Sequence, residues 1–435
     1  MLTVYLVLLF AVPSNTTIAA LGSLGRPALL WGLVMLAFWA IARLQNRSDS
    51  ASTIGQPVRF AFAVLLVIAL VSFAAAMMRG QPADQVSPAV TALLRLFSWA
   101  GVLLVALDGI RTMGDLTRLV RRIAIAAGLL AALGIVQALT GQAIVDFFSV
   151  LPGLSGPGAG VAERAGVVRS AGTAIHPLEY ATALNAALPL VIAVAVSNGF
   201  RPAPARRHLA WWIPVGLIAV SSLVGVSRSA IIGFAVVAVA MAPMLPRRFR
   251  APLAAGGIAL AGIIVVAVPG LLGASLSLFT GAGDDPSTLS RVNGLERTPE
   301  FLAASPVLGV GFGTFLPRYY IFDNQWILVL VELGVLGVLA FAGVFAAAIW
   351  SALRARRLSG EPDVMLLGYA LAVSMGVVAI LFAFFDGLSF PISAGVFFLL
   401  AGLCGSVLSI GAADASRRSH DRPAHRTLAA PQDPV

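Results

Sequence analysis

Runs of about twenty apolar residues recur along almost the whole length of this 435-residue chain. A helix of that length covers about 30 Å, which is the thickness of the hydrocarbon core of a bilayer. Charged residues make up 11% of the chain, whereas soluble domains contain about 25%. The runs lack the alternation of a membrane barrel, and backbone groups in lipid must be bonded within the segment. The sequence therefore predicts an all-α, polytopic integral membrane helical bundle.

About twelve runs predict transmembrane helices. They cover residues 2–20, 27–44, 59–77, 89–107, 122–140, 176–197, 209–226, 229–245, 252–270, 325–350, 364–385 and 389–410. The first run is interrupted by Pro13-Ser14-Asn15. These spans predict one membrane domain over residues 1–410, followed by a polar tail, residues 411–435, that we expect to be disordered and cytoplasmic.

The 29 basic residues, all of them arginine, predict the orientation of the spans. When both termini are placed in the cytoplasm, 20 arginines fall in the inner loops and the tail and 8 fall in the outer loops. This asymmetry is the one that the positive-inside rule describes. It places two long loops outside, at about 141–175 and 271–324, the second between spans nine and ten. Because the charges are divided among short loops, the composition does not indicate nucleic-acid binding.

Metal and cofactor chemistry find no support in the residue pattern. The four histidines have no metal-ligand spacing, and no Ser–His–Asp set can be argued. Cys404 is the single cysteine, so it forms no internal disulfide. The sequence predicts neither a metal site nor a cofactor.

Outer-face arginines run against the charge asymmetry, and three of them are candidate anion ligands. Arg169 lies shortly before the span at 176–197, Arg228 lies between two apolar spans with almost no loop, and Arg291 lies in the second long loop. A guanidinium can donate two parallel hydrogen bonds to a phosphate, and an ionisable group at the membrane usually faces a polar site. The alternative is an arginine that extends its side chain to the surface.

A glycine-rich segment, Ser305–Phe315, lies near the end of the second long loop. Gly311 and Gly313, together with Gly309, could form a nest of backbone amides that binds an anion, or a flexible turn before the next span. The segment has no strand–helix context for dinucleotide binding and no lysine of a Walker loop. His176 is the first residue of the predicted span at 176–197. It could either begin that helix or lie at the mouth of a site.

Two carboxylates accompany this segment. Asp323 lies at the start of the span at 325–350, where it could act as a general base or cap the helix. Glu332 lies inside the same apolar run, and a carboxylate in such a position is a functional candidate. Its alternative role is an ion pair with one of the arginines.

These motifs, in this order, resemble the O-antigen ligase and Wzy-type polysaccharide polymerase superfamily. The matching segments are Arg169–Pro177, Ser227–Ser229, Ser290-Arg291, Ser305–Phe315 and Glu332–Gly337, within about residues 120–410. The resemblance implies metal-independent glycosyl transfer at the outer face of the plasma (inner) membrane. The donor would be a glycan on undecaprenyl pyrophosphate, and the acceptor a second glycan.

The resemblance also implies roles for individual residues. Arg169, Arg228 and Arg291 would hold the pyrophosphate. From their own positions in the sequence, we expect His176, Gly311 and Gly313 to be further substrate ligands. We expect Asp323, Arg228 and Glu332 to take part in catalysis.

One departure from the family pattern affects the predicted reaction. Ligases typically carry His-Asn at the start of the span after the large loop, where this chain has Asp323-Asn324. Activation of the acceptor by histidine is therefore not carried over unless Asp323 replaces it, which favours a polymerase over a ligase. The alternative function is a flippase or other transporter of lipid-linked glycans. A transporter would place charges or broken helices near the bilayer midplane, whereas the candidate charges are predicted at one face.

Overall fold

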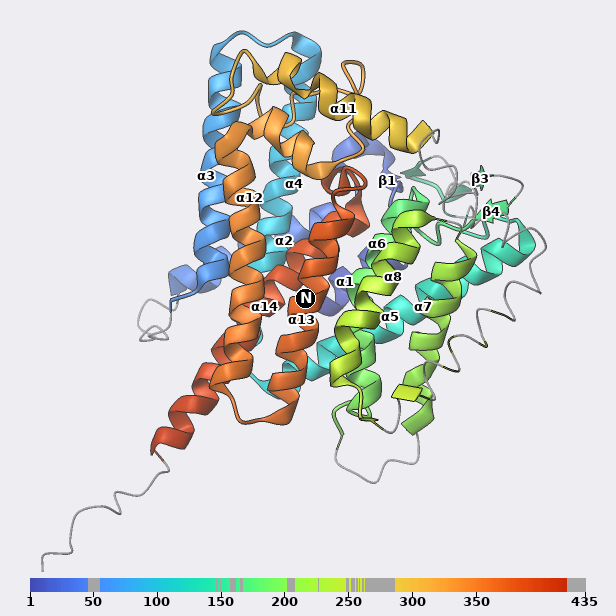
Figure 1. Ribbon diagram of the computed structural model, residues 1–435. Helices are drawn as coiled ribbons and strands as arrows, with labels where there is room; N and C mark the ends of the chain where they lie inside the picture. The colour runs from blue at the N-terminus through green and yellow to red at the C-terminus, as the bar shows by residue number, and fades with distance from the viewer. Residues whose placement is uncertain are drawn as a thin grey trace, which may run out of the picture.

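The computed structural model describes residues 1–45, 55–145, 150–156, 162–164, 167–201, 208–225, 227–247 and 286–420, together with a few single residues between these ranges. This part of the chain is a helical bundle (Figure 1). Its strands form two small antiparallel pairs, β1 (Thr17–Ile18) with β2 (Leu154–Ser155), and β3 (Ala162–Arg164) with β4 (Val167–Arg169). The prediction of an all-α polytopic membrane fold is confirmed.

Eight helices of the described part are long and apolar enough to cross a membrane. They are α2 (Pro27–Gln45), α3 (Pro57–Met78), α4 (Ala83–Gly109), α5 (Met113–Thr140), α6 (Pro177–Val196), α12 (Gln325–Leu358), α13 (Pro362–Leu381) and α14 (Pro391–His420). Two shorter apolar helices, α7 (Trp212–Val224) and α8 (Arg228–Met241), are extended by the 3-10 turns η3 (His208–Trp211) and η4 (Ala242–Met244). The predicted span at 252–270 lies largely outside the described residues, so the number of about twelve stays a prediction.

The first predicted span, residues 2–20, is wrong. α1 (Leu2–Phe10) has nine residues, which is about 14 Å of helix and less than half the hydrocarbon thickness. The chain then turns through Pro13 into β1 and η1 (Ala19–Leu24), because proline lacks the donor that a continuing helix needs. The predicted cytoplasmic position of the N-terminus assumed that residues 2–20 cross the membrane, and α1 is too short for that crossing.

At the other end, α14 continues beyond residue 410 as far as His420. Ser359 Oγ, after α12, donates to Asp414 Oδ2 at 2.7 Å, and Arg418 forms an ion pair with the same carboxylate. The predicted tail therefore begins with helical residues, and residues 421–435 lie outside the described part.

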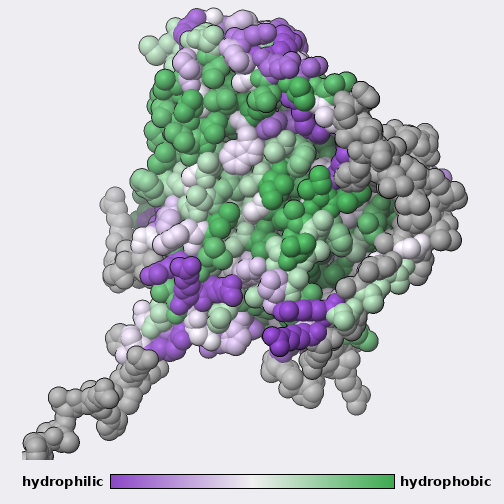
Figure 2. Space-filling view, in the orientation of Figure 1, coloured by the Kyte–Doolittle hydropathy of each residue, from purple (hydrophilic) through white to green (hydrophobic). Residues whose placement is uncertain are grey.

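The two ends of the bundle differ from its middle. Figure 1 shows the α3–α4 connection and α11 (Pro286–Leu302) at the upper end, and the α12–α13 connection at the lower end. Figure 2 shows a mainly hydrophobic surface over the middle of this face, with hydrophilic residues gathered above and below it. This distribution is expected of a protein whose middle section is covered by lipid.

α12 is broken at Gly334, whose φ of 67° and ψ of −167° lie outside the helical region. The glycine-rich segment bonds the backbone groups that the break exposes: Val310 N–H donates to the Val331 carbonyl at 2.9 Å, and Val335 N–H donates to the Pro306 carbonyl at 3.0 Å. From α3, Ser72 Oγ donates to the Leu308 carbonyl at 2.7 Å. Irregular backbone is tolerated in a membrane protein when it is bonded and buried in this way.

Gly334→Ala should lower the free energy of unfolding by about 2–4 kcal/mol, because a new Cβ strains the backbone at this φ and overlaps a neighbouring atom. The positive φ disfavours any side chain, and a Cβ at Gly334 would lie 2.2 Å from the Val307 carbonyl oxygen. Gly343→Ala in the same helix is the matched control, because a Cβ there meets nothing within 4 Å. Thermal unfolding of the purified protein in detergent measures both changes. Equal melting temperatures for the two variants would contradict the structural role of the break.

Candidate active site

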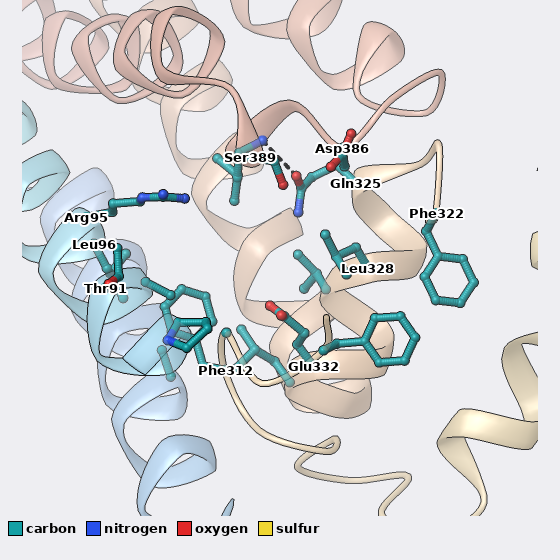
Figure 3. A pocket seen from close by; sticks show the side chains of 18 of the residues that line it. Thr91, Arg95, Leu96, Phe312, Phe322, Gln325, Leu328, Glu332, Asp386 and Ser389 are labelled. Atoms are coloured by element: carbon teal, nitrogen blue, oxygen red, sulfur yellow. Dashed lines mark hydrogen bonds between the residues drawn. The ribbon is translucent and has the colours of Figure 1, made fainter. Parts of the chain in front are cut away.

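A cavity of about 410 Å³ lies between α3, α4, the glycine-rich segment and the first part of α12 (Figure 3). The loop that joins α13 to α14, residues 382–390, closes one side of it and contains the short turn η5 (Gly387–Ser389). Its volume is within the usual range for small-molecule sites. Polar side chains in its lining include Thr91, Arg95, Gln325, Glu332, Asp386 and Ser389, and aromatic ones include Trp99, Phe312, Phe315, Tyr320 and Phe322.

Glu332 occupies the anion nest that the glycine-rich segment forms. The backbone N–H groups of Gly313 and Phe315 donate to its carboxylate, and Gly311 N–H donates to its carbonyl oxygen at 3.1 Å. In the described part of the chain Glu332 makes no ion pair, so the alternative pairing with an arginine is not seen. The nest predicted for a substrate anion thus holds the Glu332 side chain, which contributes to the cavity wall.

Asp323 does not cap α12, although a cap was one of its two predicted roles. Asn324 is the cap: its Oδ1 accepts hydrogen bonds from Trp326 N–H at 2.9 Å and Ile327 N–H at 3.3 Å. Asp323 lies instead within electrostatic range of His176 and Asp386. Its carboxylate is therefore not engaged in holding the helix end.

His176 caps α6 and also lies near Asp323. Its Nδ1 accepts a hydrogen bond from Leu178 N–H at 3.1 Å, which places the proton of the neutral ring on Nε2. Burial and the Arg169 guanidinium lower the pKa of His176, while Asp323 acts in the opposite direction. The predicted helix start is confirmed, whereas a position at the mouth of a site stays a prediction.

Asp386 is a candidate that the sequence did not reveal. It lies in the loop after α13, lines the cavity, and is within range of Asp323. Gln325 holds this loop: its backbone N–H donates to the Phe382 carbonyl at 2.8 Å, and its Oε1 accepts from Leu388 N–H at 2.7 Å. Burial raises the pKa of Asp386 to about 6, the nearby Asp323 adds to this shift, and a hydrogen bond with Ser389 opposes it. Two neighbouring carboxyls in different environments can divide into an ionised and a protonated member.

The three candidate arginines lie outside the cavity wall, as far as the described residues show. Arg169 ends β4 and is within electrostatic range of His176. Arg291 joins α11 to the 382–390 loop, because its Nε and Nη2 donate to the Phe384 carbonyl at 3.2 and 2.8 Å. Its guanidinium also lies over the Phe384 ring, with Cζ 5.6 Å from the ring centroid.

Arg228 is the first residue of α8 and is half-buried. Two residues further on, the Ala230 carbonyl accepts a hydrogen bond from Asn185 Nδ2 of α6 at 3.1 Å. A Cβ at Gly233 would lie 3.2 Å from Leu381, the last residue of α13. The start of α8 is thus held between α6, which begins after His176, and the end of α13, which precedes the Asp386 loop.

A family model matches the part of the chain that contains most of these residues. Residues 213–342 match the model of the O-antigen ligase family. This match confirms, over that segment, the resemblance that the motifs predicted. The ligase-type segment, as we call residues 213–342, includes Arg228, Arg291, the glycine-rich segment, Asp323 and Glu332, and it ends within α12. No curated protein matches the chain significantly.

Five of the predicted site residues fall into two groups that Asp386 connects. Asp323, His176 and Arg169 form a chain of electrostatic neighbours, whereas Glu332 and Gly313 line the cavity. Asp386 belongs to both groups, because it lines the cavity and interacts with Asp323. Around the ligase-type segment, the described residues contain no group of three or more His, Cys, Asp or Glu that could hold a metal ion.

Asp386→Asn should change how stability depends on pH. Because the pKa of Asp386 is raised on folding, the protonated carboxyl contributes stability that is fully present below pH 4 and is lost as pH rises through about 6. Asparagine cannot ionise, so the variant should gain on the order of 1–2 kcal/mol over the wild type at pH 7 and little at pH 4. Thermal unfolding at both pH values measures this, with the exposed Glu296→Gln, another change of carboxylate to amide, as control. A difference that is the same at both pH values would contradict the assignment.

Proposed function

We propose that this protein transfers a glycan from an undecaprenyl-pyrophosphate carrier to a glycan acceptor at the outer face of the plasma membrane. The match of residues 213–342 supports a membrane enzyme that ligates or polymerises lipid-linked glycans. The observation that carries the finer proposal is the neighbourhood of Asp323, which adjoins His176 and Asp386 and does not cap its helix. Since Asp323 stands where ligases of the family carry histidine, we favour polymerisation.

In this proposal Asp323 accepts the proton of the acceptor hydroxyl as its oxygen attacks the anomeric carbon of the donor sugar. The bond between that carbon and the phosphate oxygen breaks, and undecaprenyl pyrophosphate leaves with the electron pair. Fixed guanidinium groups stabilise the charge that develops on the leaving group, which is the role proposed for Arg169 and Arg228. Burial raises the pKa of the neighbouring Asp386, which therefore gives up its proton less readily than an exposed aspartate.

A deletion strain tests the proposal and separates its two forms. Loss of long surface chains with retained single repeats would indicate a polymerase, and accumulation of lipid-linked polymer would indicate a ligase. The wild-type gene should restore the polysaccharide, whereas an Asp323→Asn gene should not. An unchanged polysaccharide in the deletion strain would contradict the proposal.

A flippase or transporter of lipid-linked glycans is the second candidate. The break in α12 favours it, because transporters often bind their substrates at discontinuous helices. Purified protein in detergent decides between the two functions, since no membrane compartments are left to transport between. An enzyme extends or transfers lipid-linked glycan under these conditions, and a transporter does not.

Cysteine labelling tests the proposed orientation. Ala304 and Glu361 are both exposed, and they lie before and after α12. In a chain with Ala304→Cys, an impermeant maleimide added to intact cells should label the protein, whereas Glu361→Cys should react only after lysis. The native Cys404 is buried and gives little background. Labelling of Glu361→Cys in intact cells would show that the orientation is opposite to the one proposed.

A further inference from the structure

Arg95 is a charged side chain in a membrane-spanning helix for which the described residues provide no counter-ion. It extends from α4 into the cavity (Figure 3). Its Nε is buried without a hydrogen-bond partner, and no carboxylate of the described part forms an ion pair with it. An arginine in such a helix is costly and is normally paired. Arg95 is therefore placed to bind an anion that comes from outside the chain.

A second arginine lies behind it. Arg26, just before α2, is within electrostatic range of Arg95, and the two line a small void of about 40 Å³ next to the cavity. Glu179 is close to Arg26, and its carboxylate accepts from Ser14 Oγ at 3.2 Å, from Ile175 N–H at 2.9 Å and from Ile392 N–H at 2.6 Å. Glu179 thus partly balances Arg26, and the like charge of Arg26 strengthens the positive potential at Arg95.

The rest of the cavity wall has different chemistry. Glu332 and Asp386 lie on the parts of the wall formed by α12 and the 382–390 loop, and Thr91 and Ser389 add hydroxyl groups. Aromatic rings, including those of Trp99, Phe312 and Tyr320, supply flat apolar surfaces. Carboxylates accept hydrogen bonds from hydroxyl groups, and a guanidinium binds two oxygens of one acid group. A ligand with many hydroxyls, an apolar ring face and one acid group can bond to the carboxylates, pack against the aromatic rings and bind the guanidinium.

We propose that this cavity binds an acidic saccharide unit, with its carboxylate or phosphate at Arg95 and its hydroxyl groups toward Glu332 and Asp386. The identification of the saccharide as part of a lipid-linked glycan rests on the proposed function. The site is separate from Arg169, Arg228 and Arg291, which do not line the cavity in the described part of the chain. It therefore selects the sugar, while Arg169 and Arg228 are proposed to hold the carrier.

Binding of free saccharides to the purified full-length protein tests this site without any transfer reaction. The probes are glucuronate, glucose 1-phosphate, glucose and inorganic phosphate, and saturation-transfer difference NMR measures their dissociation constants. We expect at least one acidic sugar to bind ten or more times as tightly as glucose and inorganic phosphate, and the tighter of the two identifies the acid group. Equal binding of glucose and both acidic sugars would overturn the proposal. Inorganic phosphate that binds as tightly as glucose 1-phosphate would also overturn the proposal, because the site would then recognise the phosphate alone.

Substitutions locate the binding. Arg95→Gln should remove the tenfold preference for the acidic sugar and leave the melting temperature of the ligand-free protein unchanged or higher, since it removes a charge for which the described residues provide no counter-ion. Arg95→Lys keeps the charge without the planar fork and should retain only part of the preference. Arg111→Gln, an exposed arginine just after α4, is the matched control and should bind like the wild type. A preference that survives Arg95→Gln would overturn the proposal.

The outcome is distinguishable from failure of the proposed function. A protein that binds acidic sugars through Arg95 but transfers no glycan would contradict the enzyme and leave the site in place. A protein that transfers glycan but shows no preference for acidic sugars would contradict the site alone.

Discussion

Arg228→Ala should reduce glycan transfer by about 10²–10³-fold without reducing the amount of protein in the membrane. A fixed guanidinium stabilises the charge on the leaving diphosphate, and alanine supplies no replacement. Arg228→Lys should recover little activity, because lysine keeps the charge but loses the two parallel donors. The measurement is transfer by purified protein from a lipid-linked donor, with the protein in membranes measured by immunoblot.

Arg297→Ala is the matched control for this prediction. Arg297 is also predicted to be on the outer face, but it is exposed on α11, pairs with Glu300 in the next turn at 3.3 Å, and lies over the rings of Phe301 and Tyr320. We expect this variant to retain its activity. Near-normal transfer by Arg228→Ala would remove Arg228 from the site. An equal loss in both variants would show that the reaction responds to outer charge in general.

Asp323→Asn should reduce transfer by about 10²–10⁴-fold, the usual contribution of a general base, and leave the protein stable. The structure makes this substitution informative because Asn324, and not Asp323, caps α12. Asparagine is close to aspartate in size, so the change removes the base and little else. Transfer rates and melting temperatures of the same purified samples measure the two effects.

Asn324→Ala should give the opposite pattern. Loss of a helix cap costs about 1 kcal/mol of stability, while the Asp323 carboxylate is kept and transfer should be largely retained. A stable and fully active Asp323→Asn protein would contradict the role of Asp323. If Asp386→Asn were then inactive, the base would be Asp386.

The sequence predicted the long helices well because a membrane makes secondary structure a local property. Each backbone group in lipid must be bonded within its own helix, so a sufficiently long apolar run is enough evidence. The predictions were too short where a helix continues into polar surroundings, as α12 does to Leu358. The prediction for residues 2–20 was wrong because it relied on their hydropathy and not on the helix-breaking effect of Pro13, which lies beyond the end of α1.

The site was less predictable because its parts meet through contacts between distant segments. The glycines at 311 and 313 suggested a free anion nest, but its partner is the chain's own Glu332, brought there by a break at Gly334 that hydropathy does not detect. Asp323 and Asn324 are both good capping residues at adjacent positions, and only the hydrogen bonds distinguish them. Asp386 carries no motif, and its position depends on how Gln325 bonds the loop around it.

The contact of Ser72 with the glycine-rich segment limits how this protein can be divided. Ser72 and Leu308 are 236 residues apart, and α4, which carries Arg95, also precedes the ligase-type segment. A fragment with residues 213–342 alone would keep Asp323 and Glu332 but lose one wall of the cavity and the hydroxyl that bonds the broken helix. The family signature therefore does not mark a transplantable module. During biosynthesis the glycine-rich segment can reach its final conformation only after α12 has inserted beside a helix made much earlier, so the candidate site is among the last parts of the molecule to form.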